Sequence, residues 1–284
     1  MATLFILFLL VFSASSAGTA SRRSNILVLS PITAKSHTNI IKSLVNGLVN
    51  RGHSVTHWSG LKPDDVYNPN LRLLFSPELA QINSDHQIGF HHRDSPFQLM
   101  LDIPFRTATY CSVIYRDPIF RMLANSSISN SERYDLVVMD AVFNECLLPL
   151  VGILDVPLVY FNCFAPTPWL LNTMGSTLSL DHFPHPGSNY VPEMGFLQRT
   201  FNTVSGFVVA YFHRWFVMSV VDGIASRALV DISNGTSVID IEDRYMSVLL
   251  TNTHFSINYQ LPVSPSIIHV GGLHCVPAKP LPEV

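Results

Sequence analysis

The chain has 284 residues, of which 48% are hydrophobic and 13% charged, a composition that suits a large buried core and excludes an intrinsically disordered chain. The formal net charge is −3, and the 17 Lys and Arg residues are scattered along the chain. Such a charge distribution lacks the basic patch of a nucleic-acid-binding protein, so we expect no nucleic-acid partner.

The first twenty residues resemble a secretory signal peptide. An apolar run over residues 4–12 is followed by small and hydroxylated residues up to position 20. The start of the segment carries no Lys or Arg, so a plain buried N-terminal segment stays an alternative. Two glycosylation sequons, which begin at Asn125 and Asn234, are compatible with a lumenal glycoprotein. We therefore expect the chain in the secretory pathway, either in the lumen of the endoplasmic reticulum or secreted.

Residues 25–60 have the pattern of a βαβ unit. The continuous apolar run 25–29 predicts a strand buried on both faces. Apolar residues at three- and four-residue spacing over 40–49 predict a helix, with Thr38 as its N-cap and Arg51-Gly52 at its end. A second strand is predicted over residues 54–58.

The same alternation continues along the chain. Residues 134–140 predict a strand, residues 145–154 a helix and residues 157–162 another strand, and a further strand pair is indicated at 71–75 and 247–251. Strands that alternate with helices predict an α/β fold with a doubly wound, parallel, Rossmann-like sheet. The less periodic regions 79–130 and 164–202 are rich in aromatic residues, Met, Pro and His, and are candidates for lining a pocket.

Residues 206–221 are the most apolar segment after the N-terminus. Because His213 and Arg214 lie in the middle of this segment, we interpret it as a buried or membrane-surface helix, and we expect no transmembrane anchor in this chain. The four cysteines, Cys111, Cys146, Cys163 and Cys275, lack the CxxC spacing typical of zinc sites, so no metal site is expected. Cys146 and Cys163 are expected as buried small hydrophobes, and a disulfide between some pair in an oxidising lumen stays an open alternative.

A histidine follows the first predicted strand at the point where open α/β sheets bind their ligands. The turn contains no glycine, and the GxGxxG and GxxxxGK[ST] patterns of nucleotide cofactors are both absent, so we expect no cofactor. The imidazole of His37 could accept a proton from an attacking hydroxyl if a carboxylate fixed its tautomer. Asp140 ends a predicted strand at the same edge of the sheet. Taken alone, His37 could equally be structural, and Asp140 could be the N-cap of the next helix.

Several short motifs together resemble the amino-terminal half of the animal UDP-glycosyltransferase family. They occur in family order over nearly the whole chain after residue 20: Pro31 to Ser36-His37, Arg51-Gly52-His53-Ser54-Val55-Thr56, Tyr134-Asp135-Leu136-Val137-Val138-Met139-Asp140 with Glu145-Cys146, Asp155-Val156-Pro157, Phe196-Leu197-Gln198-Arg199 with Asn202, Asn252-Thr253-His254, and His269-Val270-Gly271-Gly272-Leu273-His274.

The resemblance implies two facing Rossmann-like domains, of which the first binds the acceptor and the second the UDP-sugar. His37 matches the catalytic base and Asp140 its partner, in a metal-free transfer of a hexose that inverts the anomeric carbon. Implied substrates are UDP-glucose or UDP-glucuronate and a small lipophilic acceptor such as a steroid, phenol, plant toxin or pigment, in keeping with a role in detoxification. Met100, Phe105 and Phe164 are expected to line the acceptor pocket.

The family's donor-binding signature is not found in this sequence. The expected organisation is a signal peptide over residues 1–20, an acceptor-binding domain over 21–270 and a linker over 271–284 that leads toward the missing donor-binding domain. We expect the chain alone to bind acceptors and to transfer sugar very slowly or not at all, because donor positioning should come from the other half. The alternatives are a non-enzymatic carrier of lipophilic ligands, a truncated regulatory partner that pairs with full-length relatives, and an incomplete gene model.

Overall fold

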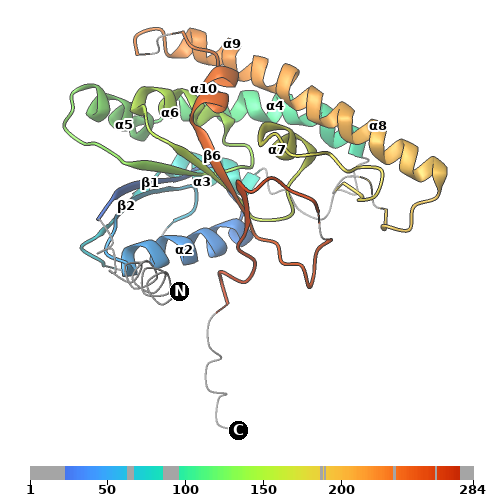
Figure 1. Ribbon diagram of the computed structural model, residues 1–284. Helices are drawn as coiled ribbons and strands as arrows, with labels where there is room; N and C mark the ends of the chain where they lie inside the picture. The colour runs from blue at the N-terminus through green and yellow to red at the C-terminus, as the bar shows by residue number, and fades with distance from the viewer. Residues whose placement is uncertain are drawn as a thin grey trace, which may run out of the picture.

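The computed structural model describes residues 23–62, 67–85, 96–185, 188, 190–232, 235–259 and 261–275 (Figure 1). The predicted signal peptide, the sequon asparagine Asn234 and the last nine residues of the predicted linker lie outside these residues. Asn125, in the other sequon, is an exposed residue of a helix.

The described residues form a single seven-stranded sheet in which every neighbouring pair of strands is parallel. The strand order is β3-β2-β1-β4-β5-β6-β7, so the direction of strand addition reverses between β1 and β4. This topology confirms the predicted doubly wound α/β fold. The strands are β1 (Asn25–Ser30), β2 (Ser54–Ser59), β3 (Leu71–Phe75), β4 (Leu136–Asp140), β5 (Leu158–Asn162), β6 (Met246–Thr251) and β7 (Ile267–His269).

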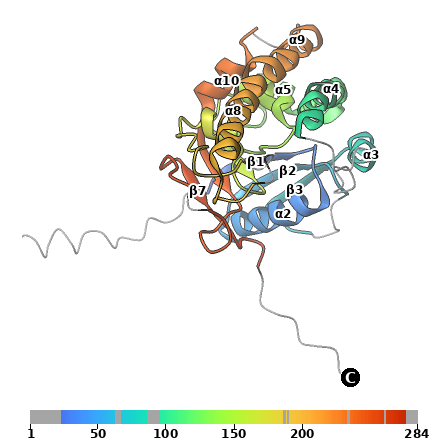
Figure 2. The same ribbon diagram turned by 90° about the vertical axis from the view of Figure 1, so that its right-hand side faces the viewer.

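Helices cover both faces of the sheet. One face is covered by α2 (Lys35–Asn50), and the other carries a thicker helical layer (Figures 1 and 2). The remaining helical elements are α3 (Pro77–Asp85), α4 (Pro96–Ile114), α5 (Pro118–Ile128), η2 (Glu145–Leu147), α6 (Leu148–Leu154), α7 (Pro168–Thr173), α8 (Phe196–Phe212), the π-helical turn η3 (His213–Val217), α9 (Met218–Ala228) and α10 (Val238–Tyr245).

The strands are apolar on both sides because each side faces a different core. In β1, Leu27 and Leu29 enter the larger core beneath the thick helical layer, whereas Ile26 and Val28 enter the smaller core beneath α2. Successive side chains of a strand point to opposite faces, so a strand covered on both faces has no solvent-facing position. The continuous apolar run in the sequence is the result.

The first helix begins earlier than predicted. The structure places its start at Lys35, with Ala34 as an extended N-cap that makes no side-chain hydrogen bond. Thr38 is not the N-cap, since its Oγ1 donates to the carbonyl of Ala34 from within the first turn. The helix ends as predicted, with Arg51 as the C-cap and Gly52 at a φ of +87°.

Residues 71–75 and 247–251 both lie in strands, but these strands do not pair with each other. The first forms β3 at one edge of the sheet, beside β2, and the second belongs to β6, between β5 and β7. Sequence patterns identify strands but carry no direct signal for their lateral order.

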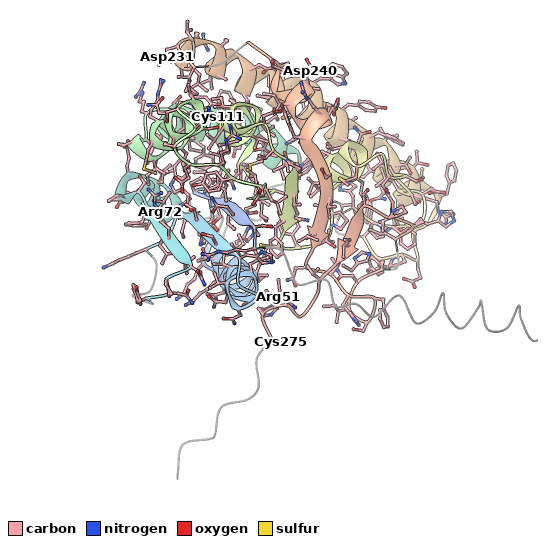
Figure 3. The ribbon with its side chains drawn as sticks, turned by 60° about the vertical axis from the view of Figure 1, so that its left-hand side comes forward. Arg51, Arg72, Cys111, Asp231, Asp240 and Cys275 are labelled. Carbon is pink, nitrogen blue, oxygen red and sulfur yellow. A yellow bond between two sulfur atoms is a disulfide. The ribbon has the colours of Figure 1, made fainter. Side chains whose placement is uncertain are left out.

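The structure contains a disulfide between Cys111 and Cys146. The expectation that Cys146 is a free buried residue is therefore wrong, and the open alternative of a bridge holds for this pair. The reason is that α4 packs against η2, which places the two Cα atoms 5.0 Å apart. Cys163 is free and buried, as expected, and Cys275 is free and exposed. Figure 3 shows Cys111 within the helical layer and Cys275 near the C-terminal end of the described chain.

Residues 206–221 belong to a longer helix. Among the described residues, one helix, Phe196–Ala228, is long and apolar enough by length and composition alone to cross a membrane. It comprises α8, η3 and α9 without a break, and its inner face packs on the helical layer (Figure 1). The inner face of residues 206–221 is buried, as one of the two predicted alternatives states. It includes Ala210, Val217 and Val221.

Candidate active site

The two predicted functional residues lie at the point where the sheet reverses its direction of strand addition. Asp140 is the last residue of β4, and His37 lies in the first turn of α2, which follows β1. Because β1 and β4 are parallel neighbours, their carboxyl ends lie at the same edge of the sheet. Open α/β sheets bind ligands in the crevice at such a reversal.

The structure brings His37 and Asp140 into direct contact. Nδ1 of His37 lies 2.9 Å from Oδ2 of Asp140, and the side chains are 14% and 0% exposed. With Nδ1 donating to the carboxylate, Nε2 of His37 is left to accept a proton. The other oxygen of Asp140 accepts from the amide of Val142. Asp140 is not a helix N-cap, since the next helical turn begins at Glu145, with Asn144 as its N-cap.

The pair shifts the pKa values of both groups. Burial acts to lower the pKa of His37, but the hydrogen bond and negative charge of Asp140 together outweigh burial and raise that pKa above its ordinary value of 6.5. Burial raises the pKa of the Asp140 carboxyl, and the contact with His37 offsets part of that increase. His37 thus becomes a stronger base than a free histidine.

Two buried or half-buried amides hold the loop between β1 and α2. Asn144 is 1% exposed, and its side chain accepts from the amide of Ile32 and donates to the carbonyl of the same residue. Asn83 of α3 donates to the carbonyls of Pro31 and Gly60. These contacts fix the loop that leads to His37 relative to the loop that follows Asp140.

Sequence reasoning missed both asparagines. The sequence does carry a weak signal for Asn144, since it lies four residues after the end of the strand that bears Asp140. For Asn83 there is no such signal, because α3 reaches the site only through the tertiary fold. The loop also lies close to Gly60, the residue after β2, where a Cβ atom would be 1.9 Å from the carbonyl oxygen of Pro31.

Cys163 lies beside the His37–Asp140 pair. The three residues offer donor atoms within 4.8 Å of one another, a spacing that could hold a metal ion. Burial, together with the charge of Asp140, raises the pKa of the Cys163 thiol, which therefore keeps its proton. Nδ1 of His37 is engaged by Asp140, and the expectation of no metal site stays a prediction.

The loop after β5 contacts His37 and also lines a cavity of about 560 Å³. Phe164 in this loop places its ring 5.9 Å from the ring of His37, and the next residue, Ala165, lines the cavity. The other lining residues come from the loop after β5, from α7 and the segment that follows it, from the loop after β6 and from the end of β7: Pro166, Pro168, Leu171, Ser179, Leu180, Phe183, Pro184, His185, Thr253, His254, Phe255, Asn258, Tyr259, Leu261 and His269.

The three predicted pocket residues have different positions. Phe164 contacts the ring of His37, is 39% exposed and is itself not among the residues that line the cavity, although its neighbour Ala165 is. Phe105 lies on α4, is 76% exposed and is not among the residues that line this cavity. Met100 belongs to the first turns of α4, and its side chain lies outside the described residues. The assignment of all three to an acceptor pocket stays a prediction.

The fold and the paired residues define a class of protein. It is a doubly wound α/β protein with a histidine–carboxylate pair at the sheet reversal and a largely apolar cavity beside it. A family model described as "UDP-glucoronosyl and UDP-glucosyl transferase" matches residues 87–284. The chain belongs to this family of UDP-glycosyltransferases.

Curated relatives agree with the family. UDP-glucosyltransferase 2 of Dactylopius coccus is 28% identical over 98% of this chain and 52% of its own length. UDP-glucuronosyltransferase 2B28 of Homo sapiens is 30% identical over 87% of this chain and 49% of its own length. The chain thus spans about half the length of the curated relatives it matches. A solved structure, the glycotransferase of kitacinnamycin, has a TM-score of 0.43 and 13% identity over 91% of this chain and 53% of the solved one, which is too remote to add to the assignment.

Proposed function

We propose that this chain is the acceptor-binding half of a UDP-glycosyltransferase in which His37 is the general base and Asp140 its positioning partner. The observation that carries the proposal is the 2.9 Å contact between Nδ1 of His37 and Oδ2 of Asp140 at the carboxyl edge of the sheet. A base held in one tautomer by a carboxylate is what a hydroxyl acceptor needs.

The proposed reaction is a single displacement. The acceptor oxygen attacks the anomeric carbon of the UDP-sugar, the bond from that carbon to the UDP oxygen breaks, and the configuration inverts. Nε2 of His37 takes the hydroxyl proton as the new bond forms, and the Asp140 carboxylate stabilises the resulting imidazolium. The residues at this site require no metal for this step.

The cavity supports a small lipophilic acceptor. Its volume of about 560 Å³ suits a small organic molecule, and most of its lining is apolar or aromatic. The polar residues of the lining are Ser179, His185, Thr253, His254, Asn258 and His269, and Oγ1 of Thr253 lies 2.5 Å from Nδ1 of His269. The donor is proposed to be UDP-glucose or UDP-glucuronate, the sugars that the names of the relatives indicate.

The Cys111–Cys146 disulfide supports a place in the secretory pathway. Disulfides persist in oxidising compartments and are rare in reducing ones. We propose the lumen of the endoplasmic reticulum, or secretion, as the location of the chain.

The test joins this chain to the second half of UDP-glucosyltransferase 2 from Dactylopius coccus. We expect His37→Ala to lower kcat by on the order of 10²–10⁴-fold while the affinity for a phenolic acceptor, measured by direct binding, is kept. His53→Gln is the matched control, because His53 lies at the amino edge of the sheet, where Nδ1 accepts from the amide of Ser24.

Equal activity of the His37→Ala protein would remove the base assignment. The 284-residue chain by itself is expected to bind the acceptor and to transfer glucose from UDP-glucose at a rate far below the usual enzyme range. Binding without any transfer, even in the joined protein, would favour the alternative of a carrier or a regulatory partner of full-length relatives.

A further inference from the structure

One face of α8 and η3 exposes a continuous row of apolar side chains. We name this row the outer stripe, and its members are Phe196, Leu197, Phe201, Val204, Phe207, Val208, Tyr211, Trp215 and Phe216. It covers residues 196–216, which at a helical rise of 1.5 Å per residue is about 31 Å. Soluble proteins rarely expose so long an apolar row without a partner for it.

The contacts of the inner face fix the orientation of this helix. The side-chain amide of Asn202 donates to the carbonyls of Leu180 and Phe183, and Nε2 of His213 lies 3.0 Å from Oε1 of Glu145. Gly206 lies so close to Leu180 that a Cβ atom there would be 2.5 Å from it. The helix cannot rotate to bury the outer stripe without losing these contacts.

Charge is nearly absent from the outer stripe. Residues 196–216 contain no Asp or Glu, and their two charged residues are Arg199 and Arg214. Arg214 is bound to Asp243 of α10, and Arg199 donates to the carbonyl of Met194. Beyond Phe216 the exposed positions become polar, beginning with Ser219 and continuing to Ser226 and Arg227. The apolar face therefore has a defined end within a single helix.

This chemistry fits a lipid surface better than a protein partner. Protein interfaces carry about one hydrogen bond per 100–200 Å², and the outer stripe offers only the Tyr211 hydroxyl and the Trp215 indole NH. Tyr and Trp are instead enriched where a membrane meets water. The helix is not placed to span a bilayer, because Asn202, His213 and Arg214 are bound to the rest of the domain.

We propose that the outer stripe lies in the interface of a lipid bilayer, parallel to its surface. The membrane contact predicted from the sequence spans residues 206–221. The proposed contact lies nearer the N-terminus, over residues 196–216, because Val217, Met218 and Val221 are buried. Figure 1 shows α8 at the outer side of the helical layer, where a flat surface can approach it.

The same helix supports the cavity. Leu180 and Phe183 line the cavity and are the residues whose carbonyls accept from Asn202. A lipophilic molecule dissolved in the bilayer would thus lie near the cavity wall. This last consequence rests on the proposed acceptor function, whereas the membrane contact itself does not.

The test is sedimentation of the purified chain with phosphatidylcholine vesicles, with and without phosphatidylserine. We expect the unmodified chain to bind both, and the double variant Phe201→Glu/Val208→Glu to bind roughly tenfold or more weakly, because each substitution replaces an apolar side chain that would enter the bilayer with a charged one. The matched control is Ser219→Glu/Ser226→Glu, which adds the same charge to the polar end of the same helix and should bind like the unmodified chain.

Trp215 provides a second measurement that needs no change to the stripe as a whole. Its emission should shift to the blue on addition of vesicles, and Trp215→Phe should remove this shift. Failure of the unmodified chain to bind vesicles, or equal binding of the Phe201→Glu/Val208→Glu variant, would overturn the proposal. A concentration-dependent dimer that this variant abolishes, without vesicle binding, would assign the stripe to a second copy of the chain instead. None of these readouts depends on sugar transfer.

Discussion

The imidazole of His37 has one nitrogen committed to Asp140, which leaves the other for a substrate. The contact matters because burial alone would weaken the base, whereas the carboxylate raises the pKa of His37 above 6.5. The base form of His37 therefore predominates only above this raised pKa. We expect kcat/KM of the joined two-half protein to rise with pH through an apparent pKa above 6.5.

Asp140→Asn should shift the rise of kcat/KM with pH toward lower pH. The variant removes the negative charge, burial then dominates and the pKa of His37 falls, while kcat drops by on the order of 10²–10⁴-fold because the imidazolium loses its counter-charge. The measurement is kcat/KM against pH. Asp135→Asn is the control, because Asp135 lies just before the amino end of β4 and accepts from the amide of Asn25. An unchanged pH profile in Asp140→Asn would contradict the pairing.

Among the elements, two loops matter most: the one between β1 and α2 and the one between β4 and η2. Asn144 joins them by two hydrogen bonds to Ile32, so the distance from His37 to Asp140 is set by backbone contacts as well as by the pair itself. We regard Asn144 as a positioning residue.

Asn144→Ala should loosen this connection. Because the backbone amide and carbonyl of Ile32 lose their buried partner, we expect a loss of about 2–3 kcal/mol in the free energy of unfolding. We also expect a lower kcat with little change in the KM for the UDP-sugar. The rise of kcat/KM with pH should shift toward lower pH. Asn125→Ala, at an exposed position of α5, should change none of these. A stability loss without any shift of the pH profile would show that Asn144 has a structural role only.

Elements and their contacts differ in how well the sequence predicts them. The buried strands were predictable because a parallel strand covered on both faces must be apolar throughout, as Ile26 to Leu29 are. The start of α2 was not predictable. Its N-cap is Ala34, which has no side chain able to form the capping hydrogen bond that marks a helix start in a sequence. The Cys111–Cys146 bridge and the role of Asn83 depend on which helices pack together, which no local pattern encodes.

The site itself was partly predictable. His37 and Asp140 follow or end buried strands, and parallel topology places such positions at one edge. Asn144 and the cavity depend on loops whose paths only the tertiary structure supplies.

At the scale of the whole molecule, the sheet contains a buried histidine apart from the pair. His57 of β2 is 5% exposed, its Nε2 lies 2.9 Å from Oγ of Ser30, and burial lowers its pKa to about 4. The folded state thus disfavours the protonated form, which the unfolded chain adopts below about 6.5. The stability that His57 contributes is complete above pH 6.5 and is lost as the pH falls toward 4.

The predicted loss between pH 6.5 and 4 is about 3 kcal/mol, from 1.36 kcal/mol for each pKa unit. Denaturant unfolding at a series of pH values measures this loss. His57→Gln keeps a hydrogen-bonding side chain but cannot take up a proton, so its stability should fall less over this range than that of the unmodified chain. Parallel pH profiles of the two proteins would contradict the assignment.

The two hydrogen bonds between Asn144 and Ile32 have a consequence for how a two-domain enzyme can be assembled. His37 and Asp140, and the loops that hold them, all belong to this one domain. The contact between His37 and Asp140 therefore forms without a donor-binding half. On the proposed function, exchanging that half for another should alter which sugar is delivered and leave the proposed activation of the alcohol by His37 intact.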